Sequence, residues 1–131
     1  MTAPDISAEL FARFTVAGEH AQSDYTGLIQ ALVAMKQKEG DIWQPAITAA
    51  YSLLLEEIKG NRNNPAQPIS FGTSGWRGKL GKDIFLRSVA LVTEAIAQMY
   101  EAVDSDQELS RLLGVKDLGE ARRRGCVLGF D

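Results

Sequence analysis

Hydrophobic residues in the first half of the chain recur at steps of three and four, the spacing of one face of an α-helix. Three such stretches occur, at residues 7–17, 24–38 and 41–58, and the third begins either after Asp41 or at Pro45. A glycine follows each stretch, where helix ends favour it: Gly18, Gly40 and Gly60. The pattern predicts three helices, the second and third of which form an antiparallel hairpin.

The pattern changes after residue 60. Residues 61–68 are rich in turn formers without periodicity, which predicts a boundary between two segments. Residues 69–71 alternate as a short β-strand does, and a glycine-rich loop follows at once. A long helix is expected over 83–103, capped by Asp83. Its apolar residues at helical spacing are expected to face a sheet: Phe85, Val89, Val92 and Ile96.

Residues 104–124 contain two candidate capping boxes, which predict two short helices in place of a long loop. The boxes are Ser105 with Glu108, and Asp117 with Glu120. The run from Cys126 to Phe130 is continuous and apolar, as a strand covered on both faces would be.

Strand, helical crossover and strand make a βαβ unit, in which the two strands lie side by side and parallel. The predicted fold class is therefore α/β. A helical extension and linker occupy residues 1–67, and a partial βαβ unit with parallel strands occupies residues 68–131.

Composition narrows the class of protein. A chain of 131 residues with 45% hydrophobic and 24% charged residues is typical of one soluble globular domain. The net charge is −3 with basic residues interspersed among acidic ones, so neither a nucleic-acid nor a membrane surface is indicated. The chain shows no basic leader and no apolar run of membrane-spanning length, which predicts a cytoplasmic protein. Lone Cys126 is expected to be buried and inert, and His20 to be a surface residue without a partner.

The loop FGTSGWRG is the feature with specific chemical meaning. Its glycines, Gly72, Gly75 and Gly78, allow close approach of the backbone to a ligand. Hydroxyl donors come from Thr73 and Ser74, and Arg77 carries a planar positive charge suited to phosphate oxygens. The Walker A and dinucleotide patterns both fail on glycine spacing. From these residues alone, a phosphate loop and a generic turn with a surface arginine remain alternatives, and Trp76 either packs the turn or lines the pocket.

The stretch ISFGTSGWRG, a long helix and a strand ending GFD resemble the start of domain I of the α-D-phosphohexomutases, the phosphoglucomutase/phosphomannomutase family. The resemblance covers residues 68–131. It implies an α/β/α domain with Thr73, Ser74, Gly75, Arg77 and Gly78 as active-site loop residues, Arg77 being the catalytic one. Asp131 matches the aspartate of the family's strand-end motif.

The resemblance implies an isomerase that moves a phosphoryl group between C1 and C6 of a hexose phosphate. The family uses a phosphoserine, Mg²⁺ and a hexose 1,6-bisphosphate intermediate. Its phosphoserine and metal-binding motifs lie further along the family's chain and are not found here. The expectation is an N-terminal fragment that is inactive alone and binds neither cofactor tightly.

Two alternatives stay open. In one, the helices of residues 1–67 mediate assembly or self-association, and the βαβ remnant binds a phosphorylated ligand without catalysis. In the other, the chain is a phosphate-loop transferase of another class. Arg122, Arg123 and Arg124 could bind phosphate, but arginines at a helix end are expected to complement the helix dipole.

Overall fold

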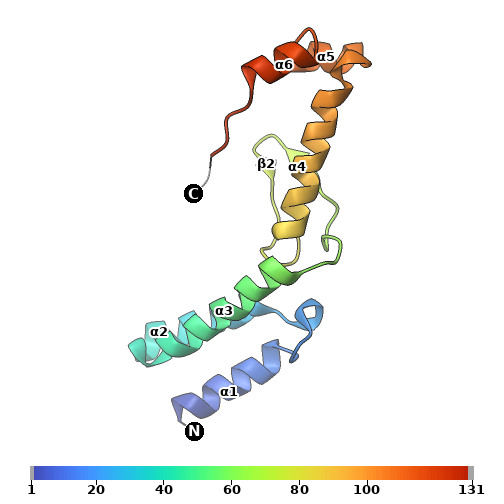
Figure 1. Ribbon diagram of the computed structural model, residues 1–131. Helices are drawn as coiled ribbons and strands as arrows, with labels where there is room; N and C mark the ends of the chain where they lie inside the picture. Colours follow the sequence, from blue (N-terminus) through green and yellow to red (C-terminus); the bar gives the residue numbers. More distant parts are fainter. Residues whose placement is uncertain (1, 130–131) are drawn as a thin grey trace. The chain divides into compact units, whose positions relative to one another are not determined.

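The computed structural model describes residues 2–129. The chain divides into two compact units, the first ending at Val89 and the second beginning at Ala90. The helices and strands, several of which are labelled in Figure 1, are α1 (Ala3–Phe14), η1 (His20–Gln22), α2 (Tyr25–Glu39), η2 (Asp41–Trp43), α3 (Gln44–Gly60), β1 (Phe71–Gly72), β2 (Gly75–Trp76), α4 (Leu86–Glu101), η3 (Ala102–Asp104), α5 (Gln107–Leu113) and α6 (Leu118–Arg124).

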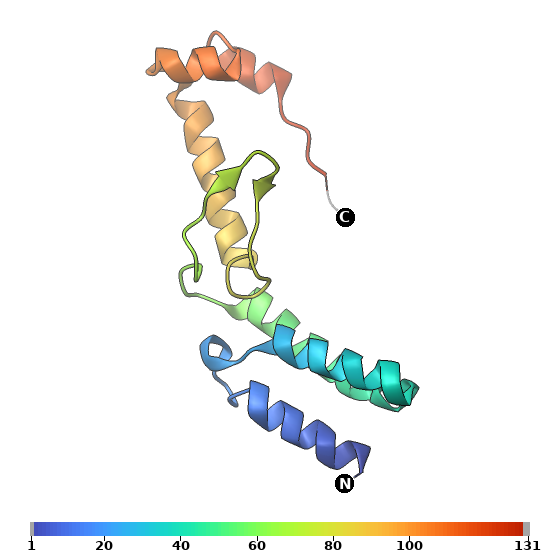
Figure 2. The same ribbon diagram turned by 180° about the vertical axis from the view of Figure 1, so that it is seen from behind.

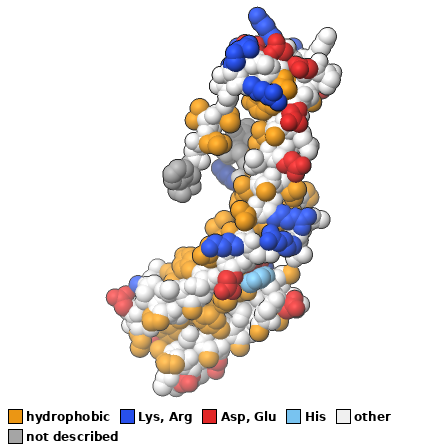
Figure 3. Space-filling view, viewed as in Figure 1, with side chains coloured by type: hydrophobic (Ala, Val, Ile, Leu, Met, Phe, Trp, Pro, Cys, Tyr) orange, Lys and Arg blue, Asp and Glu red, His pale blue; other side chains and the backbone are white. Residues whose placement is uncertain are grey.

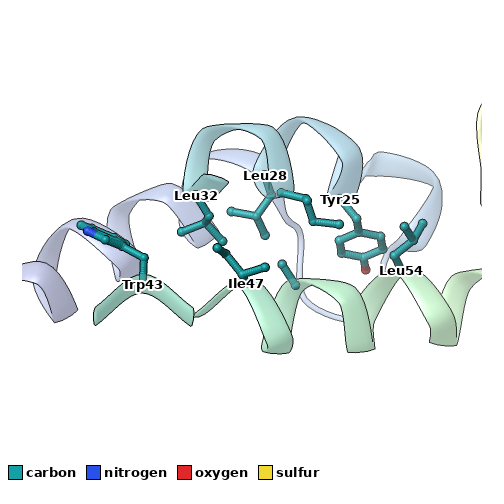
Figure 4. Close-up of a cluster of buried hydrophobic side chains, with 8 residues drawn as sticks. Tyr25, Leu28, Leu32, Trp43, Ile47 and Leu54 are labelled. Atoms are coloured by element: carbon teal, nitrogen blue, oxygen red, sulfur yellow. The ribbon is translucent and has the colours of Figure 1, made fainter. Parts of the chain in front are cut away.

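The core of the first unit lies between α2 and α3, as Figure 4 shows. Leu28 and Leu32 of α2 have no exposed surface. Tyr25, at the start of α2, lies beside Leu54 near the end of α3, as an antiparallel pair requires. The buried core residues are Tyr25, Leu28, Ile29, Leu32, Trp43, Ile47, Ala50 and Leu54, and Leu10, Phe11 and Phe14 of α1 pack against them. The predicted helical hairpin is confirmed.

Local signals set the ends of α2. Its first turn is capped by Asp24, whose carboxylate accepts a hydrogen bond of 3.1 Å from the Gly27 N–H. It ends at Gly40, where the backbone φ is 85°, a region that favours glycine. The α3 helix begins at Gln44 with Pro45 in its first turn, after the single turn η2.

The first helix starts earlier than the periodicity predicts. It begins at Ala3, where the Asp5 carboxylate accepts a hydrogen bond of 2.9 Å from the Thr2 N–H and another from its hydroxyl. It ends at Phe14, because Thr15 has extended backbone angles. The predicted helix, residues 7–17 with an end at Gly18, therefore lies about four residues too far toward the C-terminus.

The described sheet consists of β1 and β2, which pair antiparallel (Figure 2). Both strands lie within the FGTSGWRG segment, so the strand at Phe71 pairs with the continuation of its own loop. The expected parallel pairing with residues 126–130 is not formed in the described part of the chain. Cys126–Gly129 forms no strand, and the described sheet consists of β1 and β2.

The expectation for the face of α4 also needs correction. Of the four residues predicted to face a sheet, Phe85 is buried, whereas Val89 and Ile96 are 44% and 47% exposed and Val92 is half-buried. The periodicity did predict a helix, but two of the four residues on its expected buried face remain substantially exposed. Asp83 lies outside the helix and does not cap it, because α4 begins at Leu86.

The second unit contains the two predicted short helices. The carboxylate of Asp106, not Ser105, caps α5 by accepting hydrogen bonds from the N–H groups of Glu108 and Leu109. Asp117 caps α6 as expected, accepting a bond of 2.6 Å from the Glu120 N–H. A small apolar cluster joins these helices: Val103, Val115 and Ala121, with Tyr100 and Leu113 against them.

Cys126 is exposed, contrary to the prediction of a buried position. Its neighbours Val127 and Leu128 are 99% and 89% exposed, so their apolar character does not reflect burial here. The proposed match of Asp131 to the family's strand-end motif lies outside the described residues. None of the helices in the described ranges is both long and apolar enough to cross a membrane.

Candidate functional site

The FGTSGWRG segment forms a tight hairpin. Phe71 pairs with Trp76 and Gly72 with Gly75, which leaves Thr73 and Ser74 as the two turn residues. Gly75 has a φ of 105°, a backbone conformation that a residue with a side chain rarely adopts. The prediction of a strand entering a tight loop is confirmed locally, and the loop places its two hydroxyl residues at the tip.

The arginine of the motif folds back toward that tip. A guanidinium nitrogen of Arg77, Nη2, donates a hydrogen bond of 2.8 Å to the hydroxyl oxygen of Ser74. Thr73, Ser74 and Arg77 are all exposed. A guanidinium has five N–H donors in a planar fork, and a serine hydroxyl can donate while it accepts. The structure thus brings one fixed positive charge and one hydroxyl donor together on an accessible surface.

The aromatic residues of the motif pair with each other across the hairpin. The ring centroids of Phe71 and Trp76 are 6.5 Å apart and their planes are inclined by 47°. Trp76 is half-buried and Phe71 is 62% exposed. This contact favours the alternative in which Trp76 packs the turn.

A carboxylate joins the two ends of the segment that contains the hairpin. Asp83 Oδ1 accepts a hydrogen bond of 2.8 Å from the Gln67 N–H, and Oδ2 accepts one of 2.8 Å from the Lys79 N–H. Asp83 is 7% exposed. A Cβ atom on Gly78 would lie 2.4 Å from the Cβ of Asp83, so only glycine fits where the chain passes this carboxylate.

Helix α3 holds the turn that precedes Asp83. Lys82 Nζ lies 2.5 Å from the carboxylate of Glu57, whose side chain is 1% exposed, and it also donates to the backbone oxygen of His20. The Asn61 side-chain amide donates a bond of 2.8 Å to the Gly81 carbonyl. Contacts from residues 20, 57 and 61 therefore fix the segment that follows the hairpin.

Sequence reasoning missed Glu57 and the role of Asp83. A signal for Glu57 was present, because it continues the apolar stripe of Ile47, Ala50 and Leu54 at helical spacing. A charged residue on such a stripe is buried only with a partner, and its position predicts that a cation lies opposite. Asp83 gave no comparable signal, since an aspartate before a helix has the ordinary appearance of a cap.

A second ion pair lies just after the hairpin. Lys79 Nζ is 2.6 Å from Asp24 Oδ1, and both side chains are partly exposed. The hydrogen bond from Lys79 lowers the pKa of Asp24, and the Gly27 N–H adds to this effect, while partial burial opposes it. The residue that caps α2 therefore also contacts the segment leaving the hairpin.

The side chains of His20 and Arg124 make their contacts outside the hairpin. His20 is half-buried and Nδ1 lies 2.8 Å from the Tyr25 hydroxyl, so the expected partnerless surface histidine has a partner. Arg124 donates to the Gly114 carbonyl at the end of α5 and pairs with Glu120 of α6. Figure 3 shows basic and acidic side chains mixed over the face that it draws.

The resemblance implies a Mg²⁺ ion, for which carboxylate oxygens are the usual protein ligands. Within residues 2–129, no group of three or more His, Cys, Asp or Glu side chains is placed to hold a metal ion. In comparisons with known proteins, no family model, curated protein or solved structure matches the chain.

Proposed function

We propose that the chain is the N-terminal part of a cytoplasmic α-D-phosphohexomutase, and that its hairpin contributes one wall of the site that binds hexose phosphate. The observation that carries the proposal is the contact of 2.8 Å between Arg77 and Ser74 at the exposed tip of FGTSGWRG. A motif resembling an active-site loop thus has its charge and hydroxyl groups adjacent.

In this proposal Arg77 stabilises negative charge on the phosphoryl oxygens, while Thr73 and Ser74 donate hydrogen bonds to them. Phosphoryl transfer depends mainly on positioning and charge neutralisation, which a fixed guanidinium provides. Gly75 and Gly78 let the backbone approach the ligand and pass Asp83. When bound in the family's complete site, Mg²⁺ neutralises further phosphate charge.

The finer fold belongs to the same proposal. A parallel βαβ unit would form if the apolar residues after Gly125 paired with the strand at residues 69–71, as the resemblance implies. The exposure of Val127 and Leu128 supports this, because two adjacent apolar side chains at 99% and 89% exposure are costly in water. Reading the gene past the codon for Asp131 tests it. An in-frame serine motif of the T-A-S-H-N-P kind supports the mutase, whereas an immediate stop codon favours the non-catalytic assembly module.

Phosphate recognition can be tested on the chain itself. The amide signals of residues 72–78 are followed by NMR during titration with glucose 1-phosphate and, separately, with inorganic phosphate. We expect saturable chemical-shift changes in the wild type. Arg77→Ala should lower the affinity for the phosphate ligand at least about tenfold, because a charge-assisted hydrogen bond contributes about 1.5–3 kcal/mol. Arg111→Ala, which removes an exposed arginine of α5, is the control and should change nothing. Equal affinity of wild type and Arg77→Ala would refute the assignment of Arg77.

Catalysis gives an independent test. With Mg²⁺, glucose 1,6-bisphosphate and glucose 1-phosphate, the 131-residue chain should form no glucose 6-phosphate, since it supplies one wall of the site and no phosphoserine motif. Turnover above a buffer blank, or phosphate on Ser74, would contradict this expectation. In a full-length parent, Arg77→Ala should lower turnover more than about tenfold with little change in stability.

A further inference from the structure

The Asp83 carboxylate contacts the chain at both ends of the hairpin segment. Gln67 precedes the hairpin and Lys79 follows it, and the backbone N–H of each donates a hydrogen bond of 2.8 Å to a different oxygen of this one side chain. A backbone hydrogen bond joins the neighbouring residues, since the Ala66 N–H donates to the Lys82 carbonyl over 3.0 Å. The base of the segment is therefore closed by side chain and backbone together.

The hairpin needs such closure. Each of its strands has two residues, and an isolated two-stranded hairpin is at best marginally stable in water. Hydrogen bonds to an ionised carboxylate are short and about twice as strong as neutral ones. The two lysines that precede Asp83 do not compete for its carboxylate, since Lys79 Nζ pairs with Asp24 and Lys82 Nζ with Glu57. Asp83 is thus committed to the two backbone N–H groups.

We propose that Asp83 is a positioning residue for the phosphate-facing hairpin: by joining the N–H groups of Gln67 and Lys79, it keeps Arg77 and Ser74 in their adjacent arrangement. The inference rests on the proposed function for its ligand but not for its geometry. Asp83 touches no substrate in this scheme. It acts by raising the fraction of molecules in which the hairpin is arranged to bind phosphate. The apparent dissociation constant for the phosphate ligand varies inversely with that fraction.

The test uses Asp83→Asn in the whole chain. This substitution replaces one of the two acceptor oxygens of the carboxylate with an amide N–H₂ group. The matched control is Asp106→Asn, since Asp106 also accepts from two backbone N–H groups but caps α5. Hydrogen exchange at the Gln67 and Lys79 amides is the readout that needs no ligand. Both amides should be protected in the wild type and exchange at least about tenfold faster in Asp83→Asn, while Asp106→Asn leaves them unchanged.

Binding is measured in the same samples by titration with glucose 1-phosphate. Asp83→Asn should weaken binding by about tenfold with unchanged far-UV circular dichroism, as expected if about a tenth of the molecules keep a competent hairpin. Unchanged affinity in Asp83→Asn beside a binding wild type would overturn the positioning role. If the wild type binds no phosphate, the proposed function fails and the exchange data still decide the role of Asp83.

Hydrogen exchange in the wild type tests the inference even if the Asp83→Asn variant does not fold. Gln67 lies in a loop and Lys79 just beyond the hairpin, so without the Asp83 bonds neither amide has cause to be slow. Rapid exchange of both amides in the wild type would overturn the inference whatever the variants do. Protection of both, lost in Asp83→Asn and kept in Asp106→Asn, would support it.

Discussion

Replacing Lys82 by methionine should destabilise the first unit strongly. The side chain of Glu57 is 1% exposed, that of Lys82 is 20% exposed, and the charged atoms lie 2.5 Å apart. Methionine keeps most of the aliphatic volume of lysine but removes the cation. The Glu57 carboxylate would then be buried without its partner, which is the unfavourable way to disrupt a buried pair.

The expected magnitude follows from that burial. Removing one partner of a buried ion pair costs about 3–5 kcal/mol, and the partial exposure of Lys82 places this site near the lower limit, about 3 kcal/mol. Domains of ordinary stability unfold with about 5–15 kcal/mol, so the change is a large share of the total. Glu57→Gln, which keeps an oxygen acceptor and leaves the lysine accessible to water, should cost about 1 kcal/mol. The two changes should not be additive, because the residues are in contact.

Urea unfolding followed by tryptophan fluorescence measures the effect. Trp43 and Trp76 both lie in the first unit, so their emission reports on it alone. The control is Lys36→Met, since Lys36 forms a more exposed ion pair of 2.9 Å with Asp41 and should contribute less than about 1 kcal/mol. Equal losses in Lys82→Met and Lys36→Met would refute the conclusion that burial makes the Glu57 pair important.

Three further changes test other parts of the first unit. Leu28→Ala removes a side chain with no exposed surface and should lower the free energy of unfolding by about 3 kcal/mol in urea denaturation. Gly81→Ala should cost about 2 kcal/mol in the same assay, because Gly81 has a φ of 83° and a Cβ there would lie 2.5 Å from a carboxylate oxygen of Glu57. The lowered pKa of Asp24 means that its bond to Lys79 stabilises the fold above pH 3.8 and is lost as the pH falls through the folded-state value. Melting temperatures below pH 3.8 should therefore fall less steeply for Asp24→Asn than for the wild type, and parallel curves would contradict the assignment.

The parts of the fold that sequence predicts well are those decided within one or two turns of chain. Helix α2, its cap at Asp24 and its end at Gly40 follow from a periodic stripe and two local signals. The tight loop likewise follows from the glycines around Thr73 and Ser74, although the antiparallel pairing of β1 with β2 was not predicted. In the α5 region the predicted cap, Ser105, was wrong, because the adjacent Asp106 caps the helix.

Other expectations failed because they depended on distant partners. The run 126–130 is apolar enough for a strand, but a strand needs a partner backbone, and the pairing in the described sheet joins β1 with β2. The expected burial of one face of α4 also failed in part, since Val89 and Ile96 are 44% and 47% exposed. Hydrophobic pattern indicates which face can be buried, not what buries it.

The residues that bear the proposed chemistry and those that position them come from different parts of the sequence. FGTSGWRG supplies Arg77 and Ser74, whereas the structure fixes the segment through Asp83, Glu57 and the Gln67 N–H. Glu57 and Gln67 precede the stretch that resembles the phosphohexomutases. A chain beginning at residue 68 would keep every residue of the motif but lose both of these contacts. Because a hairpin with two residues in each strand is marginal alone, the proposed phosphate-binding geometry depends on the preceding helices as much as on the motif.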